Sequence, residues 1–176
     1  LVALQVSCKL MFANDAGWSG FSPFLAIAVF SGFIVKEKNM SFLFPLLALF
    51  ISDALIHFLY LNDMFGFEGF YAGQWKNYLL LLAITFIGWA LKGKSYSTLA
   101  VGALAGPSLF FLVSNFMVWQ ANTEIVYAKS FRGLMICYEA GLPFYRNSLI
   151  ATLLFLPVIL IVYNYLTKKK AVLILA

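Results

Sequence analysis

Charged side chains are scarce in this sequence, and their scarcity excludes an ordinary soluble domain. Lys, Arg, Asp and Glu make up 11% of the 176 residues, whereas hydrophobic residues make up 63%. A typical soluble domain has about 25% charged and about 45–50% apolar residues. A chain of this length cannot hide so large an apolar excess in one core, because small domains keep much of their surface exposed. Part of the solvent must therefore be lipid, and we predict an integral membrane protein.

Cysteine and histidine are also rare, which argues against disulfide, metal and catalytic chemistry. Cys8 and Cys137 are isolated in or beside apolar segments, a pattern that builds neither a disulfide framework nor a metal site. His57 is the single histidine, and the scattered acids give no spacing of zinc ligands around it. Asp53 and His57 have no third partner of the kind that activates a nucleophile. The sequence predicts no metal, no cofactor and no enzyme.

Six apolar runs are candidate membrane helices. A span needs about 20 mostly apolar residues, because the hydrocarbon layer is ~30 Å thick and a helix rises ~1.5 Å per residue. We expect helices over residues 1–12, 23–35, 40–61, 78–91, about 96–119, and 147–166. The first run is short, and we expect that its beginning is absent. No strand-like alternation occurs, so the predicted fold is a single all-α transmembrane domain over residues 1–176.

The connection before the last run is too polar to span a membrane. Its apolar residues instead predict one face of an interfacial helix, formed by Ile125, Phe131, Leu134 and Met135.

The distribution of basic residues predicts the orientation of the bundle. One set of alternate helix ends carries Lys36, Lys38, Lys92, Lys94, Lys168, Lys169 and Lys170, and the opposite ends carry Lys76, Lys129, Arg132 and Arg146. Basic residues are enriched on the cytoplasmic side, and tryptophan at the membrane interfaces. The lysine-rich side is therefore expected to be cytoplasmic, with both termini inside. The net charge of +5 reports this topology and does not indicate a nucleic-acid partner.

One phosphate-binding pattern occurs in the sequence. Residues 88–95, "GWALKGKS", fit the P-loop consensus, which needs a preceding strand and a following helix. Here an apolar run precedes the pattern, which favours a helix end with lysines that reach the membrane surface. If the protein uses ATP, we expect a partner to supply the site.

An acid inside the third apolar run is the most unusual feature. Asp53 and His57 are four residues apart and share one helix face, in the outer half of the expected span. Intramembrane acids usually face the bundle interior, where they pair or mark a pathway. Asn115, Trp119, Arg146 and Asn147 reach the same level from other helices. Two interpretations of Asp53 stay open: a site for a small polar or aromatic-compatible molecule, or a structural pair with Arg146 or a helix-end amide. For His57, a structural role is the commoner case.

Small residues mark two helix faces. Residues 102–106 are "GALAG", with Gly102 and Gly106, and residues 28–32 are "AVFSG", with Ala28 and Gly32. Such spacing allows close helix approach in lipid. The faces are explained either by packing inside the bundle or by docking of another membrane protein.

Several longer motifs resemble a known family. "SPFLAIAVFSGFIVKEKNMSFLFPLLALFISDALI", "SNFMVW" and "CYEAGLPFYRNSL" resemble, in order, motifs of a bacterial family of transport proteins. That family is similar to the substrate-binding components of energy-coupling-factor vitamin transporters. The resemblance implies six helices, cytoplasmic termini, an outward pocket, and a separate transmembrane coupling protein with ATPases.

Candidate residues follow from the same resemblance. It implicates Ser52, Asp53, Asn115, Trp119, Arg146 and Asn147 in the motifs, and the face with Ala26, Ala28 and Gly32 in docking the coupling protein. His57 lies outside the pattern. We expect the substrate-binding subunit of a small-molecule uptake system in a bacterial inner membrane. The alternative is an accessory subunit of a larger membrane complex that binds protein, lipid or pigment.

Overall fold

The computed structural model describes residues 1–12, 15–92, 95–122 and 126–167. Within these ranges the chain forms six α-helices, one short 3₁₀ helix and no strand, which confirms the all-α class. The elements are α1 (Val2–Phe12), η1 (Ala16–Trp18), α2 (Phe24–Ile34), α3 (Lys38–Leu61), α4 (Trp75–Ala90), α5 (Tyr96–Ala121) and α6 (Phe131–Thr167).

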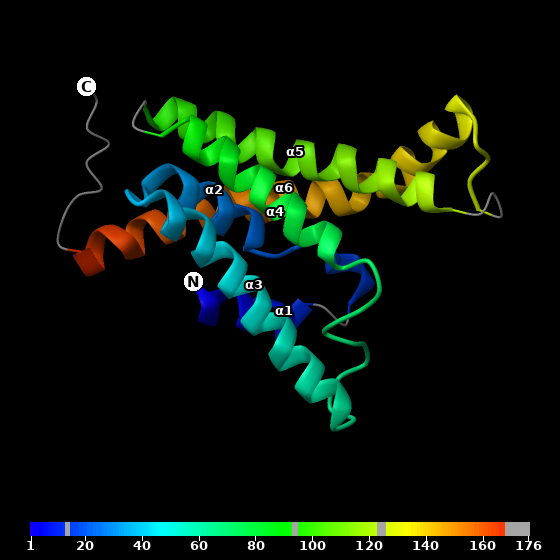
Figure 1. Ribbon diagram of the computed structural model, residues 1–176, viewed down its shortest axis with the longest axis horizontal. Helices are drawn as coiled ribbons and strands as arrows, with labels where there is room; N and C mark the ends of the chain where they lie inside the picture. Colours follow the sequence, from blue (N-terminus) through cyan, green and yellow to red (C-terminus); the bar gives the residue numbers. More distant parts are fainter. Residues whose placement is uncertain (13–14, 93–94, 123–125, 168–176) are drawn as a thin grey trace.

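Helix α2 is the centre of the bundle. It contacts α3, α4, α5 and α6, and every residue from Leu25 to Phe33 is buried. A helix that is apolar all round is stable only when it is covered on every side. α1 packs against α3, and the two helices lie on one side of the pair formed by α5 and α6 (Figure 1).

The small-residue faces pack inside this bundle. A Cβ on Gly32 of α2 would overlap the backbone of Thr85 and Trp89 in α4, so only glycine permits this approach. Cβ atoms on Gly102 and Gly106 would lie 3.2 Å and 3.1 Å from side chains of α2 and α4. Ala26 and Ala28 have no exposed surface. Of the two explanations for these residues, packing within the chain is the one observed, and it leaves them no exposed face for a coupling protein.

Three helices in the described ranges are long and apolar enough to cross a membrane, namely α3, α5 and α6. α1 and α2 have 11 residues each, and α4 has 16. An 11-residue helix is about 17 Å long, roughly half the hydrocarbon thickness. The expected membrane character thus has support from three long helices, whereas the three shorter helices fall below the spanning length.

Helix α6 corrects two sequence expectations. It is continuous from Phe131 to Thr167, so the predicted interfacial helix and the predicted span over residues 147–166 are parts of one element. Its first half packs on α5: the Tyr138 hydroxyl donates to the Leu112 carbonyl at 3.0 Å, and the Cys137 thiol to the Asn115 carbonyl at 3.4 Å. Phe131 and Met135 are exposed and Leu134 is half-buried; Ile125 lies outside the described residues.

The two ends of α3 and α4 differ: one carries lysine contacts, and the other carries the connection between the two helices. At the start of α3, the Lys92 ammonium donates to the Val35 carbonyl and, at 2.9 Å, to the Lys36 carbonyl. Burial lowers the pKa of Lys92, and the Lys36 charge lowers it further. At the other end of α3, residues 62–74 connect to α4 (Figure 1). Lys36 and Lys92 therefore lie at the same end of the bundle, as expected. Lys94, Lys168, Lys169 and Lys170 lie outside the described residues.

In the described part of the chain, the P-loop pattern lacks the strand that must precede it, although α5 begins directly after it at Tyr96. Gly88 lies inside α4, against the backbone of Val29, and no strand precedes it. Gly93 and Lys94 of the pattern lie outside the described residues.

Candidate binding cavity

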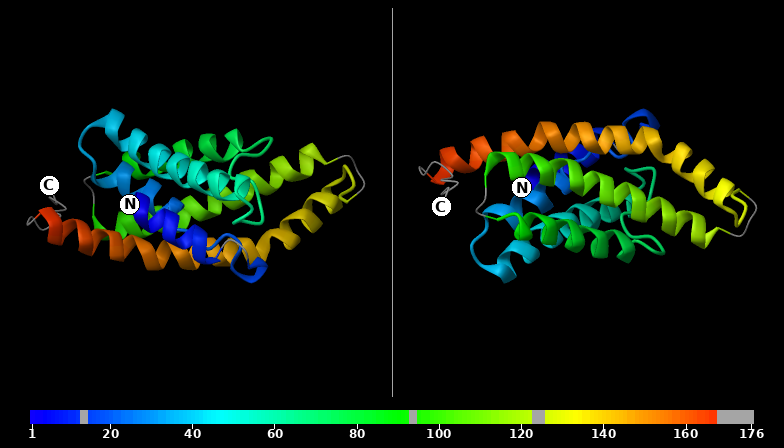
Figure 2. Two further views of the ribbon diagram at one scale, coloured as in Figure 1. Left: turned by 90° about the horizontal axis from the view of Figure 1, so that it is seen from below. Right: turned by 90° about the horizontal axis from the view of Figure 1, so that it is seen from above.

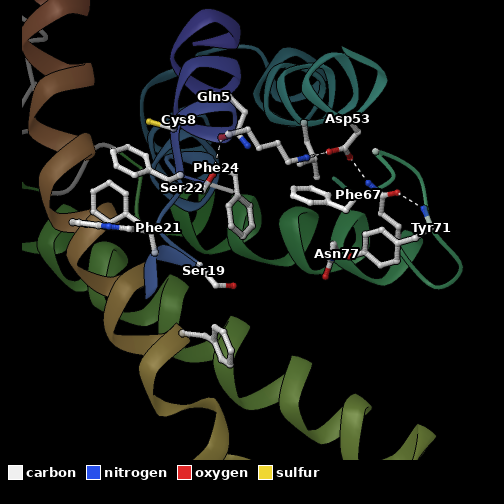
Figure 3. Close-up of a pocket in the computed structure, with 18 of the residues that line it drawn as sticks. Gln5, Cys8, Ser19, Phe21, Ser22, Phe24, Asp53, Phe67, Tyr71 and Asn77 are labelled. Carbon is white, nitrogen blue, oxygen red and sulfur yellow. Dashed lines mark hydrogen bonds and ion pairs between the residues drawn. The ribbon is translucent and has the colours of Figure 1, made fainter. Parts of the chain in front are cut away.

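A cavity of about 700 Å³ opens between α1, α3 and the beginning of α4. Its walls come from one face of α1, residues 18–24, the middle of α3, and residues 67–77, and Phe110 and Phe144 reach it from α5 and α6. Figure 3 shows Cys8 and Phe21 toward one end of it and Asp53 and Tyr71 toward the other. Small-molecule sites typically measure about 300–1,000 Å³ and combine apolar walls with a few placed polar groups. The cavity meets both criteria.

Asp53 lies in one wall with no exposed surface. Its Oδ1 forms an ion pair with the ammonium group of Lys9 on α1. Its Oδ2 accepts hydrogen bonds from the Gln74 amide and, at 2.7 Å, from the Tyr78 hydroxyl. A buried carboxylate is stable only when it is paired and its lone pairs are satisfied. Asp53 therefore joins α1, α3 and α4 at the cavity.

Of the two structural partners considered for Asp53, a helix-end amide is observed, namely that of Gln74 at the start of α4, and Arg146 is not. Arg146 is exposed on α6 and makes no hydrogen bond or ion pair with the described residues, whereas Lys9 takes this place. The sequence contained a signal for the true pair. Lys9 is the one charged residue in a mostly apolar run, and such a residue needs an internal counter-ion as much as Asp53 does.

The connection from α3 to α4 holds Gln74 in a fixed orientation. The Gln74 Oε1 accepts the Tyr71 N–H at 3.2 Å while its amide nitrogen donates to Asp53. The Tyr71 hydroxyl in turn accepts a hydrogen bond from Asn77 at 2.7 Å. Burial raises the pKa of Tyr71, the Asn77 hydrogen bond lowers it, and the Asp53 charge raises it. Tyr71 is therefore a neutral phenol at physiological pH.

The connection from α3 to α4 also packs closely against the backbone of α3 at Gly69. A Cβ on Gly69 would overlap the backbone of Asp53 and His57, so the chain can approach here only at glycine. His57 is next to this contact, and its ring centroid is 5.5 Å from that of Phe70. Its Nδ1 is buried and has no hydrogen-bond partner among the described residues. His57 is not part of the cavity lining.

Aromatic rings form the opposite wall. Phe12, Trp18 and Phe21 have ring centroids 5.2 Å apart in all three pairings, which is a favourable separation for aromatic contacts. Phe24 packs edge-on against Phe110 at 5.3 Å. The cavity thus has an ionic wall and an aromatic wall.

Asn147 lies outside the cavity but holds a segment of its wall in place. Its amide nitrogen donates to the carbonyl oxygens of Gly17 at 2.8 Å and Ser19 at 2.9 Å. Both residues belong to the segment that carries Trp18 and Phe21 into the wall. Gly20 in this segment has φ +85°, and a Cβ on it would lie 2.8 Å from the Phe144 carbonyl oxygen. Asn147 thus positions a wall segment and does not line the cavity.

Comparison with protein-family models places the chain in a family. Residues 1–173 match a family model described as "Family of unknown function (DUF6580)". The chain belongs to this family. No curated protein and no solved structure matches it.

The other predicted site residues lie in the hairpin of α5 and α6, outside the cavity. The Asn115 side chain packs against Gly141 of α6 and donates to the Phe111 carbonyl at 2.8 Å. The Trp119 indole donates to the Ala128 carbonyl at 2.9 Å, and the Lys129 ammonium lies 5.2 Å from its ring. Of these candidates, together with Ser52 and His57, Asp53 is the one that lines the cavity, and Asn147 supports its wall. Among the described residues no group of three or more His, Cys, Asp or Glu is placed to hold a metal ion.

Proposed function

We propose that this chain is the membrane-embedded substrate-binding subunit of a small-molecule uptake system, and that the cavity beside Asp53 is its binding site. The observation that carries the proposal is the combination of about 700 Å³ of space, a wholly buried ion-paired carboxylate, and an aromatic wall. A catalytic role would need a placed nucleophile or metal, and the proposal includes neither. The solute is bound, not transformed.

The position of the cavity supports an outward-facing site. The cavity adjoins the connections around η1 and between α3 and α4, away from the end where Lys92 meets the Lys36 carbonyl. With the lysine-rich end in the cytoplasm, the cavity opens toward the outside. The proposal therefore includes six membrane-embedded helices with both termini inside, in a bacterial inner membrane. A transmembrane coupling protein and ATPases, as in energy-coupling-factor transporters, would drive uptake.

A second candidate function has its own supporting observation. The hairpin of α5 and α6 extends beyond the other helices (Figures 1 and 2), and it exposes large apolar side chains along this extension, among them Phe116, Val118, Val126 and Phe131. Such a surface fits an accessory subunit of a larger membrane complex. On this view the cavity holds no transported solute.

Thermal unfolding of the detergent-purified chain tests the proposal. A solute that binds only the folded state raises the apparent melting temperature, so we expect one member of a vitamin and cofactor-precursor panel to do so. The matched variants are Asp53→Asn at the cavity and Arg146→Gln on the exposed face of α6. The shift should disappear in the first and persist in the second. Absence of a shift with every solute, together with co-purification of a complex lacking ATPases, would favour the accessory role.

A further inference from the structure

We infer that the cavity takes an organic cation with a flat aromatic body, and that the ligand's ammonium group replaces that of Lys9 at Asp53. The inference rests on the proposed small-molecule-binding function and specifies its ligand class. In this account Lys9 is a tethered competitor that keeps the carboxylate paired while the cavity is empty of solute.

The charge of the lining favours a cation. Among the described residues that line the cavity, the charged ones are Lys9, Asp53 and Glu68, so the lining carries one net negative charge. An anionic ligand would place a second negative charge near Asp53, which has no exposed surface, and this costs free energy. A cationic ligand instead neutralises the lining.

The hydrogen bonds of Asp53 allow such an exchange. Gln74 and Tyr78 both bind Oδ2, whereas Lys9 binds Oδ1. A ligand ammonium at Oδ1 therefore leaves the other two donors in place. Leaving the buried carboxylate unpaired would be the most costly step. The exchange of one ammonium group for another avoids it. Lys9 is suited to leave, because its side chain is 22% exposed and lysine is a point charge on a flexible stem.

The aromatic wall supplies the rest of the recognition. Phe12, Trp18 and Phe21 form one cluster, and Phe67 lies beside Asp53 (Figure 3). Aromatic faces stack with flat rings and attract cations through their quadrupole. A ligand with its charge at Asp53 and its ring toward Phe21 would use both walls. Displaced Lys9 remains in the same lining as Glu68, an acidic group that compensates its charge.

Three probes with one indole ring separate the effect of charge from that of shape. Tryptamine is cationic, tryptophol is neutral and indole-3-acetate is anionic. We would measure the melting temperature of the detergent-purified full chain with each probe, and the dissociation constants of those that bind. The inference expects the largest stabilisation by tryptamine. If Lys9 occupies Asp53 about nine-tenths of the time, Lys9→Gln should lower the tryptamine dissociation constant about tenfold.

Variants of Asp53 test whether its charge is what recognises tryptamine. Asp53→Asn should abolish the preference for tryptamine. If it unfolds the chain, the double variant Lys9→Gln/Asp53→Asn removes both charges together and serves in its place. Size-exclusion elution and helical circular dichroism show whether each variant is folded. Any solute of the wider panel that binds is compared in wild type and Lys9→Gln in the same way.

The possible failures are distinguishable. Stabilisation by indole-3-acetate that Lys9→Gln abolishes would overturn the inference, since Lys9 would then bind an anion, but the proposed function would stand. Equal stabilisation by tryptophol and tryptamine would also overturn it, because charge would not be recognised. Failure of all three probes and of the whole panel would overturn the proposed function as well.

Discussion

Lys9 of α1 and Asp53 of α3 form an ion pair across 44 positions of the sequence. The carboxylate has no exposed surface, and its two other partners come from the beginning of α4 or just before it. The cavity and the stability of the helix arrangement around it thus depend on one buried charge.

Loss of Lys9 alone should destabilise the chain. Lys9→Met leaves the Asp53 charge with neutral donors only, and we expect a loss of ~2–3 kcal/mol, somewhat less than for a fully desolvated pair. Lys9→Met/Asp53→Asn should recover part of this loss, since no buried charge remains unpaired. Thermal unfolding of Lys9→Met, of Asp53→Asn and of the double variant gives the coupling energy between the two residues. Additive effects would show that the ion pair contributes nothing.

Substitution of Gly69 should disturb the cavity wall. In Gly69→Ala the added Cβ collides with the backbone of α3 at Asp53 and His57, and overpacking of this kind costs ~1–3 kcal/mol. Gly73→Ala is the matched control, because Gly73 has φ +87° and no atom near the built Cβ. Its penalty is only that of the backbone conformation, ~1–2 kcal/mol. A loss of stability below ~1 kcal/mol in Gly69→Ala would contradict the close contact.

Asn147 and Arg146 are neighbours in the sequence, but their variants should behave differently. Asn147→Ala removes two hydrogen bonds to the segment with Trp18, each of which contributes ~0.5–1.5 kcal/mol. Arg146→Gln changes an exposed side chain and should alter stability by less than ~0.5 kcal/mol. Equal effects of the two variants on the melting temperature would count against the positioning role of Asn147.

Glycine at position 32 should be more critical than glycine at position 102. Gly32→Ala forces the backbones of α2 and α4 apart, whereas a Cβ on Gly102 meets only the side chains of Val29 and Leu91 at 3.2–3.3 Å. We expect the first variant to lower the melting temperature of the isolated chain strongly and the second slightly. A normal melting temperature in both, with loss of a co-purifying partner, would restore the docking interpretation.

The sequence predicted the helices better than their contacts. Long apolar runs locate spanning helices directly, and the third run was expected to begin within two residues of the observed start of α3 at Lys38. The first half of α6 was predicted as a separate interfacial helix, because its scattered polar residues make it too polar to span a membrane. In the structure α5 covers one face of it, and such tertiary packing is not visible in a single segment.

The candidate site was predictable only in part. An acid in an apolar helix is costly, so Asp53 stood out in the sequence. Its partner was missed because the short first run was interpreted as an incomplete span and Lys9 was not weighed as a counter-ion. The aromatic wall could not be predicted, because it depends on contacts between distant segments. Asn147 donates hydrogen bonds to the carbonyl oxygens of Gly17 and Ser19, and Gly20 packs against the Phe144 carbonyl.

The most direct test of the central claim is ligand protection of Cys8 from a small thiol reagent. Cys8 lines the cavity, whereas Cys137 is buried between α5 and α6 and donates to the Asn115 carbonyl. Cys137 is thus an internal reference in the same molecule, and Cys8→Ala identifies the signal. A bound solute should slow labelling of Cys8 at least tenfold (an order-of-magnitude expectation for a site about 90% occupied) and leave Cys137 unchanged. Equal labelling of Cys8 with and without every solute that raises the melting temperature would contradict the assignment of the cavity as the binding site.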